Sequence, residues 1–250
     1  MNVSRTVVCL KWGDMYGPEY VNRLFAMVSR NVDSPVRFVC FTEDATGLRD
    51  DIEIKALPDF PEPPYKYARY CSAWRKLALF DAAKLGLEGR VLFLDLDIVI
   101  LRSIEPLFEG AAPFMMLENW YQPGKGQASV MRFDGDSMKP VLTRYLADPI
   151  AVLEEFVTEQ EYIWAKAISG ASFFDDRLCL SFKKHVMHSG LMRFSSRHYE
   201  TPRGASMLVF HGRPNPPDAI RGEWGKPMPR LKRWWKGLKP CPWIAEYWRE

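Results

Sequence analysis

The chain has 250 residues, of which 47% are hydrophobic and 14% are aromatic, and this composition excludes a disordered or fibrous protein. The length suits one large α/β domain or two small ones. The five cysteines are scattered and form no C-x-x-C pair, which argues against a disulfide framework and against a zinc ribbon. The net charge of +3 is small, but residues 221–250 alone carry eight Lys or Arg and three Glu.

The first forty residues predict a strand–helix–strand unit. Arg5–Leu10 and Val36–Phe41 are short apolar runs typical of buried strands, and a helix is expected from Pro18 to about Arg30. Such a unit forms a parallel sheet, and ligands bind beyond the carboxyl ends of its strands. The loops at residues 11–17 and 42–44 are therefore candidate binding loops. No G-x-G-x-x-G follows the first strand, so a dinucleotide fingerprint is absent.

The N-terminal stretch has no signal-peptide pattern, and no run approaches the roughly 20 apolar residues of a membrane-spanning helix. Together with the cysteine pattern, this predicts a reducing, cytoplasmic setting.

A helix is expected from about Tyr67 to Leu85, closed by Gly86, after a short edge strand and a proline-rich bend. Its apolar stripe contains Trp74, Leu77 and Phe80, with Lys76 at the edge of the stripe. Lys76 could reach a phosphate as a point charge. Spacing alone favours the alternative, a surface lysine that flanks the stripe.

The most informative stretch follows that helix. Val91–Leu94 predicts a buried strand, and it continues into Asp95 and Asp97 and then into Ile98–Leu101. On an extended chain both carboxylates would project from the same face, where they would repel unless a cation lay beside them. A divalent ion, Mg²⁺ or Mn²⁺, suits two such hard oxygen ligands. The alternative is a strand that ends at Leu94 and leaves both aspartates solvated in a turn.

The remaining elements are predicted from apolar patterns and turn signals. His211 stands at the end of the last strand, where it is either a ligand or a structural histidine. We expect a short helix at Ser103–Phe108, a hairpin of Pro113–Leu117 and Gln127–Phe133, helices at Asp136–Leu146 and Val152–Ile168, and strands at Leu178–His185 and Ser206–Phe210.

Together these pieces resemble GT-A-type glycosyltransferases of the retaining sort found in glycosyltransferase family eight and its relatives, such as glycogenin and bacterial lipopolysaccharide glycosyltransferases. The matching stretches occur in the family's order and cover most of residues 5–220. They are RKLALF (75–80), VLFLDLDIVI (91–100), SIEPLF (103–108), EQEYI (159–163) and VFHGRPNP (209–216).

The resemblance implies an α/β fold of the GT-A type, with a mostly parallel central sheet flanked by helices and a smaller antiparallel portion. It implies a catalytic domain over residues 1–220, with a nucleotide-binding half at 1–100 and an acceptor-side half at 101–220. Residues 221–250 would form a basic, Trp-rich extension.

The resemblance also implies a site. Asp95, Asp97 and His211 would hold Mn²⁺ or Mg²⁺, and Asp95 would also contact the ribose. Lys76 would meet the donor, and Gly212 and Arg213 would approach the diphosphate. Further donor-binding positions are Trp12, Asp14, Tyr16 and Thr42 for the nucleotide and Gln127 and Ser129 for the sugar.

Glu159 and Gln160 would lie beneath the transferred sugar as the catalytic pair. The family commonly has Asp-Gln at this place, so the carboxylate here is one methylene longer. Gln127 and Ser129 stand where the family has Asn and Gly. Because these residues would contact the transferred sugar, both departures from the family pattern affect which sugar is expected and whether its configuration is expected to be retained.

The implied function is a metal-dependent transfer of a sugar from a nucleoside diphosphate sugar, a UDP-sugar, to a glycan or glycolipid acceptor with retention. One alternative is a haloacid-dehalogenase-type phosphatase, although Ile98 and Val99 occupy the places where Thr or Gly would follow its second aspartate. The other alternative is a non-catalytic binder of nucleotide sugars with the same fold.

The extension at residues 222–250 mixes five tryptophans with lysines and arginines, most densely at Lys232–Lys236. This mixture suits peripheral contact with an anionic membrane surface. The alternative is a segment folded against the catalytic domain with its tryptophans buried. Nucleic acid is disfavoured as a partner, because no nucleic-acid-binding motif appears.

Overall fold

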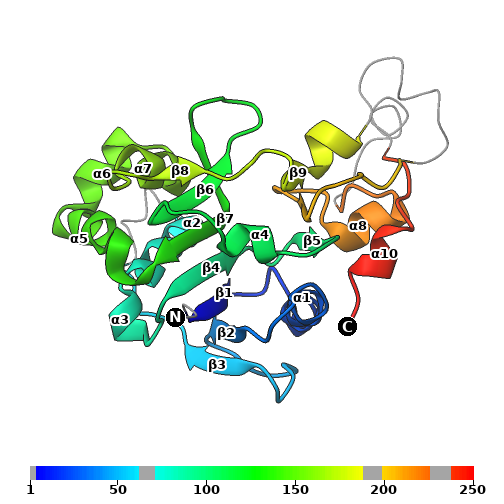
Figure 1. The fold of residues 1–250 in the computed structure, drawn as a ribbon, viewed down its shortest axis with the longest axis horizontal. Helices are drawn as coiled ribbons and strands as arrows, with labels where there is room; N and C mark the ends of the chain where they lie inside the picture. Colours follow the sequence, from blue (N-terminus) through cyan, green and yellow to red (C-terminus); the bar gives the residue numbers. More distant parts are fainter. Residues whose placement is uncertain (1–3, 62–70, 188–198, 226–237) are drawn as a thin grey trace. The chain divides into compact units, whose positions relative to one another are not determined.

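Figure 1 shows a computed structural model of the chain, which describes residues 4–61, 71–187, 199–225 and 238–250. The chain is divided into two compact units whose segments alternate along the sequence. The first unit comprises residues 1–16, 36–95 and 107–174, and the second comprises 17–35, 96–106 and 175–250. The expected division at residue 220 stays a prediction.

The first unit is built on a seven-stranded sheet in the order β3-β2-β1-β4-β7-β6-β8. β3, β2, β1 and β4 run parallel, β7 is antiparallel to both β4 and β6, and β8 is parallel to β6. This mixed sheet confirms the predicted fold class. The strands are β1 Arg5–Lys11, β2 Arg37–Thr42, β3 Glu53–Ala56, β4 Arg90–Leu94, β6 Phe114–Glu118, β7 Gly126–Asp134 and β8 Ser172–Phe173.

One face of this sheet carries the core of the unit. Alternate side chains of the strands, such as Val8, Val39 and Phe93, pack there against the helical segments that follow β3 and β7. These segments are α2 Cys71–Trp74, a 3₁₀ helix at Arg75–Phe80, α3 Ala82–Leu85, a 3₁₀ turn at Gly135–Met138, α5 Lys139–Ala147, α6 Pro149–Glu155 and α7 Glu159–Ala165.

The single helix predicted over Tyr67–Leu85 is wrong, because residues 71–85 form three short pieces; residues 67–70 lie outside the described residues. The five residues from Lys76 to Phe80 are all buried, which a helix with one apolar stripe could not achieve. Gly86 ends α3 in the left-handed conformation, with φ of 64°, as expected.

The helix predicted over Val152–Ile168 is also broken. α6 ends at Glu155, and α7 begins at Glu159 behind Thr158, whose hydroxyl accepts a hydrogen bond from the Glu161 amide at 3.4 Å. The T-x-x-E pattern of Thr158 and Glu161 is that of a capping box, which starts a helix. Glu159 therefore stands in the first turn of a new helix and not on a solvated mid-helix face.

The second unit contains α1 Pro18–Arg30, in agreement with the prediction. Its small sheet has the order β5-β10-β9, where β10 is antiparallel to β5 and parallel to β9. The strand predicted at Leu178–His185 is three residues long and is followed by a π-helix at Phe182–Val186. The bounds are β5 Ile98–Ile100, β9 Cys179–Ser181, β10 Met207–Val209, α8 Pro216–Arg221 and α10 Ile244–Tyr247; α4, Glu105–Phe108, lies at the boundary between the units.

The last residues of the chain pack on α1 within the second unit. Trp248 is 5% exposed and lies edge-on to Tyr20, with 5.2 Å between ring centroids, and the Arg23 guanidinium lies 3.9 Å from the centroid of the indole. Arg30 donates hydrogen bonds to the carbonyls of Tyr247 and Arg249. Residues 238–250 thus follow the packed alternative, whereas Lys232–Lys236 lie outside the described residues.

Helices long and apolar enough to cross a membrane are absent from the described residues.

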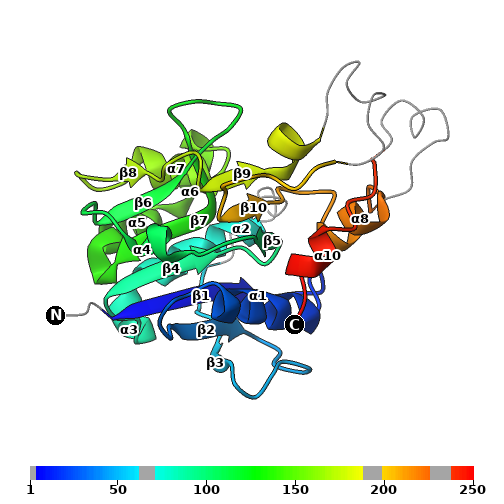
Figure 2. The ribbon, with the colours of Figure 1, turned by 45° about the vertical axis from the view of Figure 1, so that its right-hand side comes forward.

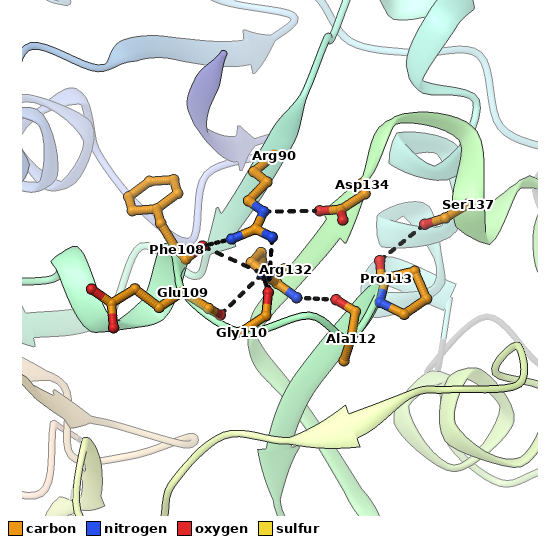
Figure 3. A network of polar contacts seen from close by, with 9 residues as sticks. All are labelled: Arg90, Phe108, Glu109, Gly110, Ala112, Pro113, Arg132, Asp134 and Ser137. Atoms are coloured by element: carbon orange, nitrogen blue, oxygen red, sulfur yellow. Dashed lines mark hydrogen bonds and ion pairs between the residues drawn. The ribbon is translucent and has the colours of Figure 1, made fainter. Parts of the chain in front are cut away.

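Two arginines fasten the segment that follows α4 to the sheet of the first unit (Figure 3). Arg132 on β7 is completely buried and donates to the carbonyls of Phe108, Glu109, Gly110 and Ala112. Arg90 on β4 also donates to the carbonyl of Gly110, at 2.8 Å. Burial lowers the pKa of the Arg132 guanidinium, because removal from water disfavours its charged form. The hydrogen bonds to the carbonyls offset this cost of burying the charge.

Replacing Arg132 by Met should therefore lower the free energy of unfolding by about 3 kcal/mol, because several buried carbonyls lose a charged donor. Urea denaturation followed by circular dichroism measures this change. Arg177→Met is the matched control, since that side chain is 85% exposed. A loss for Arg132→Met no larger than for the control would contradict the proposed fastening role.

Candidate functional site

The two aspartates lie at the point where the chain leaves one sheet for the other. β4 ends at Leu94, residues 96 and 97 form a turn, and β5 begins at Ile98. The continuous strand that the sequence predicts is therefore wrong, because residues 98–100 pair with β10 in the second unit. The alternative is right that the strand ends at Leu94 and that a turn follows, but it is wrong that the aspartates are solvated, since Asp97 is 5% exposed and the Asp95 side chain is 23% exposed.

A buried lysine faces Asp95 in the first unit. Lys76 is 7% exposed, and its Nζ lies 2.9 and 3.0 Å from the two carboxylate oxygens of Asp95. The same Nζ donates to the Ala128 carbonyl at 3.2 Å and lies 3.9 Å from Glu159 Oε1. The interpretation of Lys76 as a surface lysine is therefore wrong, because the 3₁₀ segment turns its ammonium group toward the carboxyl end of β4.

An irregularity in β7 supplies the carbonyls of this cluster. The pairing of β6 with β7 shifts between Met116, opposite Met131, and Leu117, opposite Gln127. The intervening residues form a bulge, a feature that re-aims the backbone locally. Asp95 N donates to the Ser129 carbonyl at 2.9 Å, beside the Ala128 carbonyl that Lys76 contacts.

The side chains of Gln127 and Ser129, both predicted to touch the sugar, bond to each other. Gln127 Nε2 donates to Ser129 Oγ at 2.7 Å, and the Ser129 amide donates to Gln127 Oε1 at 2.9 Å. Both residues are buried. The arrangement fixes the Gln127 amide beside the Asp95 end of β4.

Glu159 is the second acidic group of the cluster. It is 8% exposed, and burial raises the pKa of its carboxyl group, while the positive charge of Lys76 acts in the opposite direction. Gln160 follows it and is half-buried. Gly126 allows α7 to lie close to β7, since a Cβ atom at Gly126 would meet the Trp164 Cβ at 2.9 Å.

We expect Glu159→Gln to reveal this raised pKa as a pH-dependent stability difference. The wild-type carboxyl is neutral in both states below its ordinary pKa of 4.5, and above that value ionisation favours the unfolded chain. The Gln variant should thus gain stability relative to wild type as the pH rises from 4.5 to the raised pKa of the folded state, and the difference should then level off. Urea titrations between pH 4 and 8 measure it, with Glu155→Gln, an exposed position, as the control. A difference independent of pH would contradict the prediction.

The predicted nucleotide-binding residues stand at the ends of β1 and β2, which are paired through Lys11 and Thr42. Trp12 packs against the core cluster, and Asp14 is exposed. The Thr42 hydroxyl accepts from the Asp44 amide at 3.1 Å, so it organises its own turn. Tyr16, at the end of the loop, is half-buried. The Gly13 amide donates to Glu43 Oε1 at 2.8 Å, which joins the two loops as the strand–helix–strand prediction expected.

In the second unit, Asp97 precedes β5 and His211 follows β10, so both stand at the same end of this antiparallel pair, where Ile98 is opposite Val209. The Phe210 amide donates to the Asp97 carbonyl at 3.3 Å. His211 Nε2 lies 2.7 Å from Ser181 Oγ, and Lys183 Nζ donates to the His211 carbonyl at 2.6 Å. Burial, followed by the charge of Lys183, lowers the pKa of His211 to about 4, so its imidazole is neutral at pH 7.

Gly212 and Arg213 follow this histidine. Gly212 has a φ of 65°, a left-handed conformation that favours glycine. Arg213 forms an ion pair with Asp218 at 3.3 Å, and Asp218 also accepts from the Asn215 amide at 3.1 Å. The Arg213 side chain is thus held toward the start of α8.

Three residues beside these predicted positions were missed by sequence reasoning. Ser181 and Lys183 contact His211 from the segment expected to be a strand, and no motif marks them. Burial raises the pKa of Tyr20 to about 12, its hydroxyl bonds to Asn215, and the charge of Asp97 adds to the rise. The helical pattern placed Tyr20 on the apolar face of its helix. Such a pattern predicts which side chains are buried, but it does not predict the hydrogen-bond partner of a hydroxyl group.

The donor chemistry fits the expected Mn²⁺ or Mg²⁺. Asp97 is a buried carboxylate, and the neutral imidazole of His211 need not lose a proton to bind an ion at pH 7. Ser181 Oγ contacts His211 Nε2, so that nitrogen is open to an ion only after the hydroxyl turns away. Among the described residues there is no group of three or more His, Cys, Asp or Glu side chains close enough together to hold a metal ion.

Comparison with known proteins gives the fold. No family model matches the sequence, and no curated protein sequence matches it. Solved structures do match: the galactosyltransferase LgtC in complex with donor and acceptor sugar analogues has a TM-score of 0.59 at 13% identity, over 91% of this chain and 99% of LgtC. The chain has the GT-A glycosyltransferase fold.

Two further structures share this GT-A fold. The glycosyltransferase GlyE of Streptococcus pneumoniae has a TM-score of 0.57 at 16% identity, over 94% of this chain and 60% of GlyE. The bifunctional glycosyltransferase WbbM has a TM-score of 0.55 at 10% identity, over 86% of this chain and 47% of WbbM. This chain therefore spans nearly all of LgtC but only about half of the other two proteins.

Proposed function

We propose that the protein is a metal-dependent glycosyltransferase that transfers a sugar from a UDP-sugar to a glycan or glycolipid acceptor with retention. The observation that carries the proposal is the buried cluster of Lys76, Asp95 and Glu159 at the carboxyl end of β4. The cluster places the Lys76 ammonium group beside the carboxylates of Asp95 and Glu159. It lies at the carboxyl end of a parallel strand, which is where parallel sheets bind ligands. The LgtC structure with donor and acceptor sugar analogues supports the substrate class.

Departure of the nucleoside diphosphate is the step that needs positive charge. Lys76 supplies a fixed ammonium group in a buried setting, where electrostatic stabilisation is strong. Asp95, Asp97 and His211 are the proposed ligands of Mn²⁺ or Mg²⁺, which when bound would neutralise the charge of the leaving diphosphate. Gly212 and Arg213 are proposed to approach the same diphosphate.

The sugar develops positive charge as the bond to the diphosphate breaks. Glu159 is proposed to stabilise this charge or to orient a hydroxyl group; burial raises the pKa of its carboxyl group, and the positive charge of Lys76 acts in the opposite direction. Gln160, which follows it in the first turn of α7, is proposed as its partner. The paired Gln127 and Ser129 side chains would contact the sugar.

The nucleotide is proposed to bind at the ends of β1 and β2 through Trp12, Asp14, Tyr16 and Thr42. These residues border the loops that the Gly13–Glu43 hydrogen bond joins. We further propose that the protein works in the cytoplasm and that, within the basic tail of residues 222–250, the part preceding the packed residues 238–250 would contact an anionic membrane surface.

Calorimetry with UDP-, GDP- and ADP-sugars, each with and without Mn²⁺, tests the proposal, together with an assay of UDP release. We expect a UDP-sugar to bind more tightly with Mn²⁺ and to release UDP. Binding without transfer or hydrolysis would instead indicate a non-catalytic nucleotide-sugar binder. Hydrolysis of p-nitrophenyl phosphate without any nucleotide-sugar binding would favour the phosphatase alternative, which the GT-A fold already disfavours.

A further inference from the structure

The hairpin between β6 and β7 ends in a loop, residues 119–125, that extends beyond the sheet of the first unit (Figure 2). It leaves the sheet at the edge where Asp95 leaves β4, because Leu94 pairs with Val130 and the Asp95 amide bonds to the Ser129 carbonyl. In the strand order, β7 and β6 lie on one side of β4, and β1 and β2, which carry the proposed nucleotide site, lie on the other. The loop therefore belongs to the side opposite the nucleotide.

This loop is held by its own polar groups. The amides of Tyr121 and Gln122 donate to Asn119 Oδ1 at 2.9 and 3.2 Å, and the Gly124 amide donates to Glu118 Oε1 at 2.6 Å. The Asn119 amide donates to the Lys125 carbonyl at 2.8 Å, which closes the loop. A loop braced in this way presents its side chains without a large ordering cost on binding.

An aromatic ring stands on this braced loop. Among the large hydrophobic side chains that lie exposed in the described residues, Tyr121 is the one aromatic, at 58% exposure. Its neighbour Trp120 is half-buried. An exposed aromatic ring with a polar tip is a common element of binding surfaces, because it offers a rigid apolar face at low entropic cost.

The loop is also tied to the helix that carries the proposed catalytic pair. Lys125 Nζ forms an ion pair with Glu161 Oε1 at 2.9 Å, and Glu161 lies two residues after Glu159 on α7. Gly126, at the start of β7, lets α7 approach closely. The loop that carries Tyr121 is thus joined to the helix that carries Glu159.

We propose that Tyr121, with Trp120 beside it, forms the platform on which a sugar ring of the acceptor stacks. A pyranose has one face of C–H groups that packs on an aromatic ring while its hydroxyl groups stay hydrated or bond to neighbouring polar side chains. This inference rests on the proposed transferase function and assigns the acceptor-recognition residues within it.

Saturation-transfer NMR on the full chain tests the platform with methyl β-D-galactopyranoside, methyl α-D-glucopyranoside and maltose, each with and without UDP and Mn²⁺. We expect at least one glycoside to bind wild type, Tyr121→Ala to bind it about five- to tenfold more weakly, and Tyr121→Phe to bind as wild type does, since stacking needs the ring. Leu146→Ala, an exposed apolar position of the same unit, is the matched control and should bind normally.

Absence of binding by wild type in all samples, or equal binding by Tyr121→Ala, would overturn the platform. Failure of the transferase proposal has a different signature, because it would appear as absent UDP-sugar binding in calorimetry while the glycoside signal persists. The two ideas are therefore tested by separate measurements.

Discussion

Replacing Lys76 by Met is expected to slow UDP release from a UDP-sugar by about 100-fold or more, the usual consequence of removing one preorganised electrostatic group. The same change should lower the free energy of unfolding by about 3–5 kcal/mol, because Asp95 loses its cation in a largely buried setting. The remaining carboxylates of Asp95 and Glu159 would then repel each other. Rates measured with saturating donor, together with urea denaturation, give both quantities.

Lys139→Met is the matched control for this experiment. Lys139 also forms an ion pair, with Asp81 at 2.7 Å, but its side chain is 46% exposed, so water replaces much of what the pair provides. We expect that variant to keep its activity and to unfold almost as wild type does. Equal effects of the two substitutions would mean that Lys76 is an ordinary ion-pair partner and not a site residue.

Asp97→Ala is expected to abolish metal-stimulated UDP release, a loss of about 1000-fold or more, since a lost ligand removes the several kcal/mol that a bound metal ion contributes. The reason is the donor set: Asp97 and His211 are the two proposed ligands of the second unit, and the first is 5% exposed. Mn²⁺ binding, measured by electron paramagnetic resonance without any substrate, should weaken in parallel.

Asp97→Asn separates charge from shape in this test, because it keeps the size of the side chain and removes its negative charge. Asp175→Asn is the control, since that carboxylate pairs with Arg177 at an exposed place in the same unit. An Asp97→Ala protein with full activity, or with unchanged Mn²⁺ affinity, would refute the assignment of Asp97 as a metal ligand.

Much of the fold follows from local patterns in the sequence. The bounds of α1 and the parallel pairing of β1 with β2 agree with prediction because the apolar period is clear there and Pro18 marks the first helical turn. The hairpin of β6 and β7 was predicted equally well, since apolar runs flank a loop rich in turn residues.

Several of the failed predictions share one cause, which is that tertiary burial overrides local periodicity, whereas the break between α6 and α7 is marked locally by Thr158. The segment at residues 71–85 forms three pieces in which Lys76 to Phe80 are all buried, and no spacing rule anticipates that. Asp95 and Asp97 lie on either side of a change of sheet without any Gly, Pro or Asn to mark a turn. The burial of Lys76, which decides its role, depends on the 3₁₀ winding and was therefore not predictable from spacing.

The bulge in β7 has a practical consequence for mutagenesis. Asp95 and Lys76 are held partly by the peptide oxygens of Ser129 and Ala128, which every amino acid possesses. Alanine scanning is blind to such groups: it leaves Ala128 unchanged, and a silent result at Ser129 would say nothing about the part of its carbonyl in the site. Replacing the peptide bond after residue 128 by an ester, whose carbonyl accepts hydrogen bonds more weakly, would probe the Ala128 carbonyl and would also remove the Ser129 N–H that donates to Gln127 Oε1.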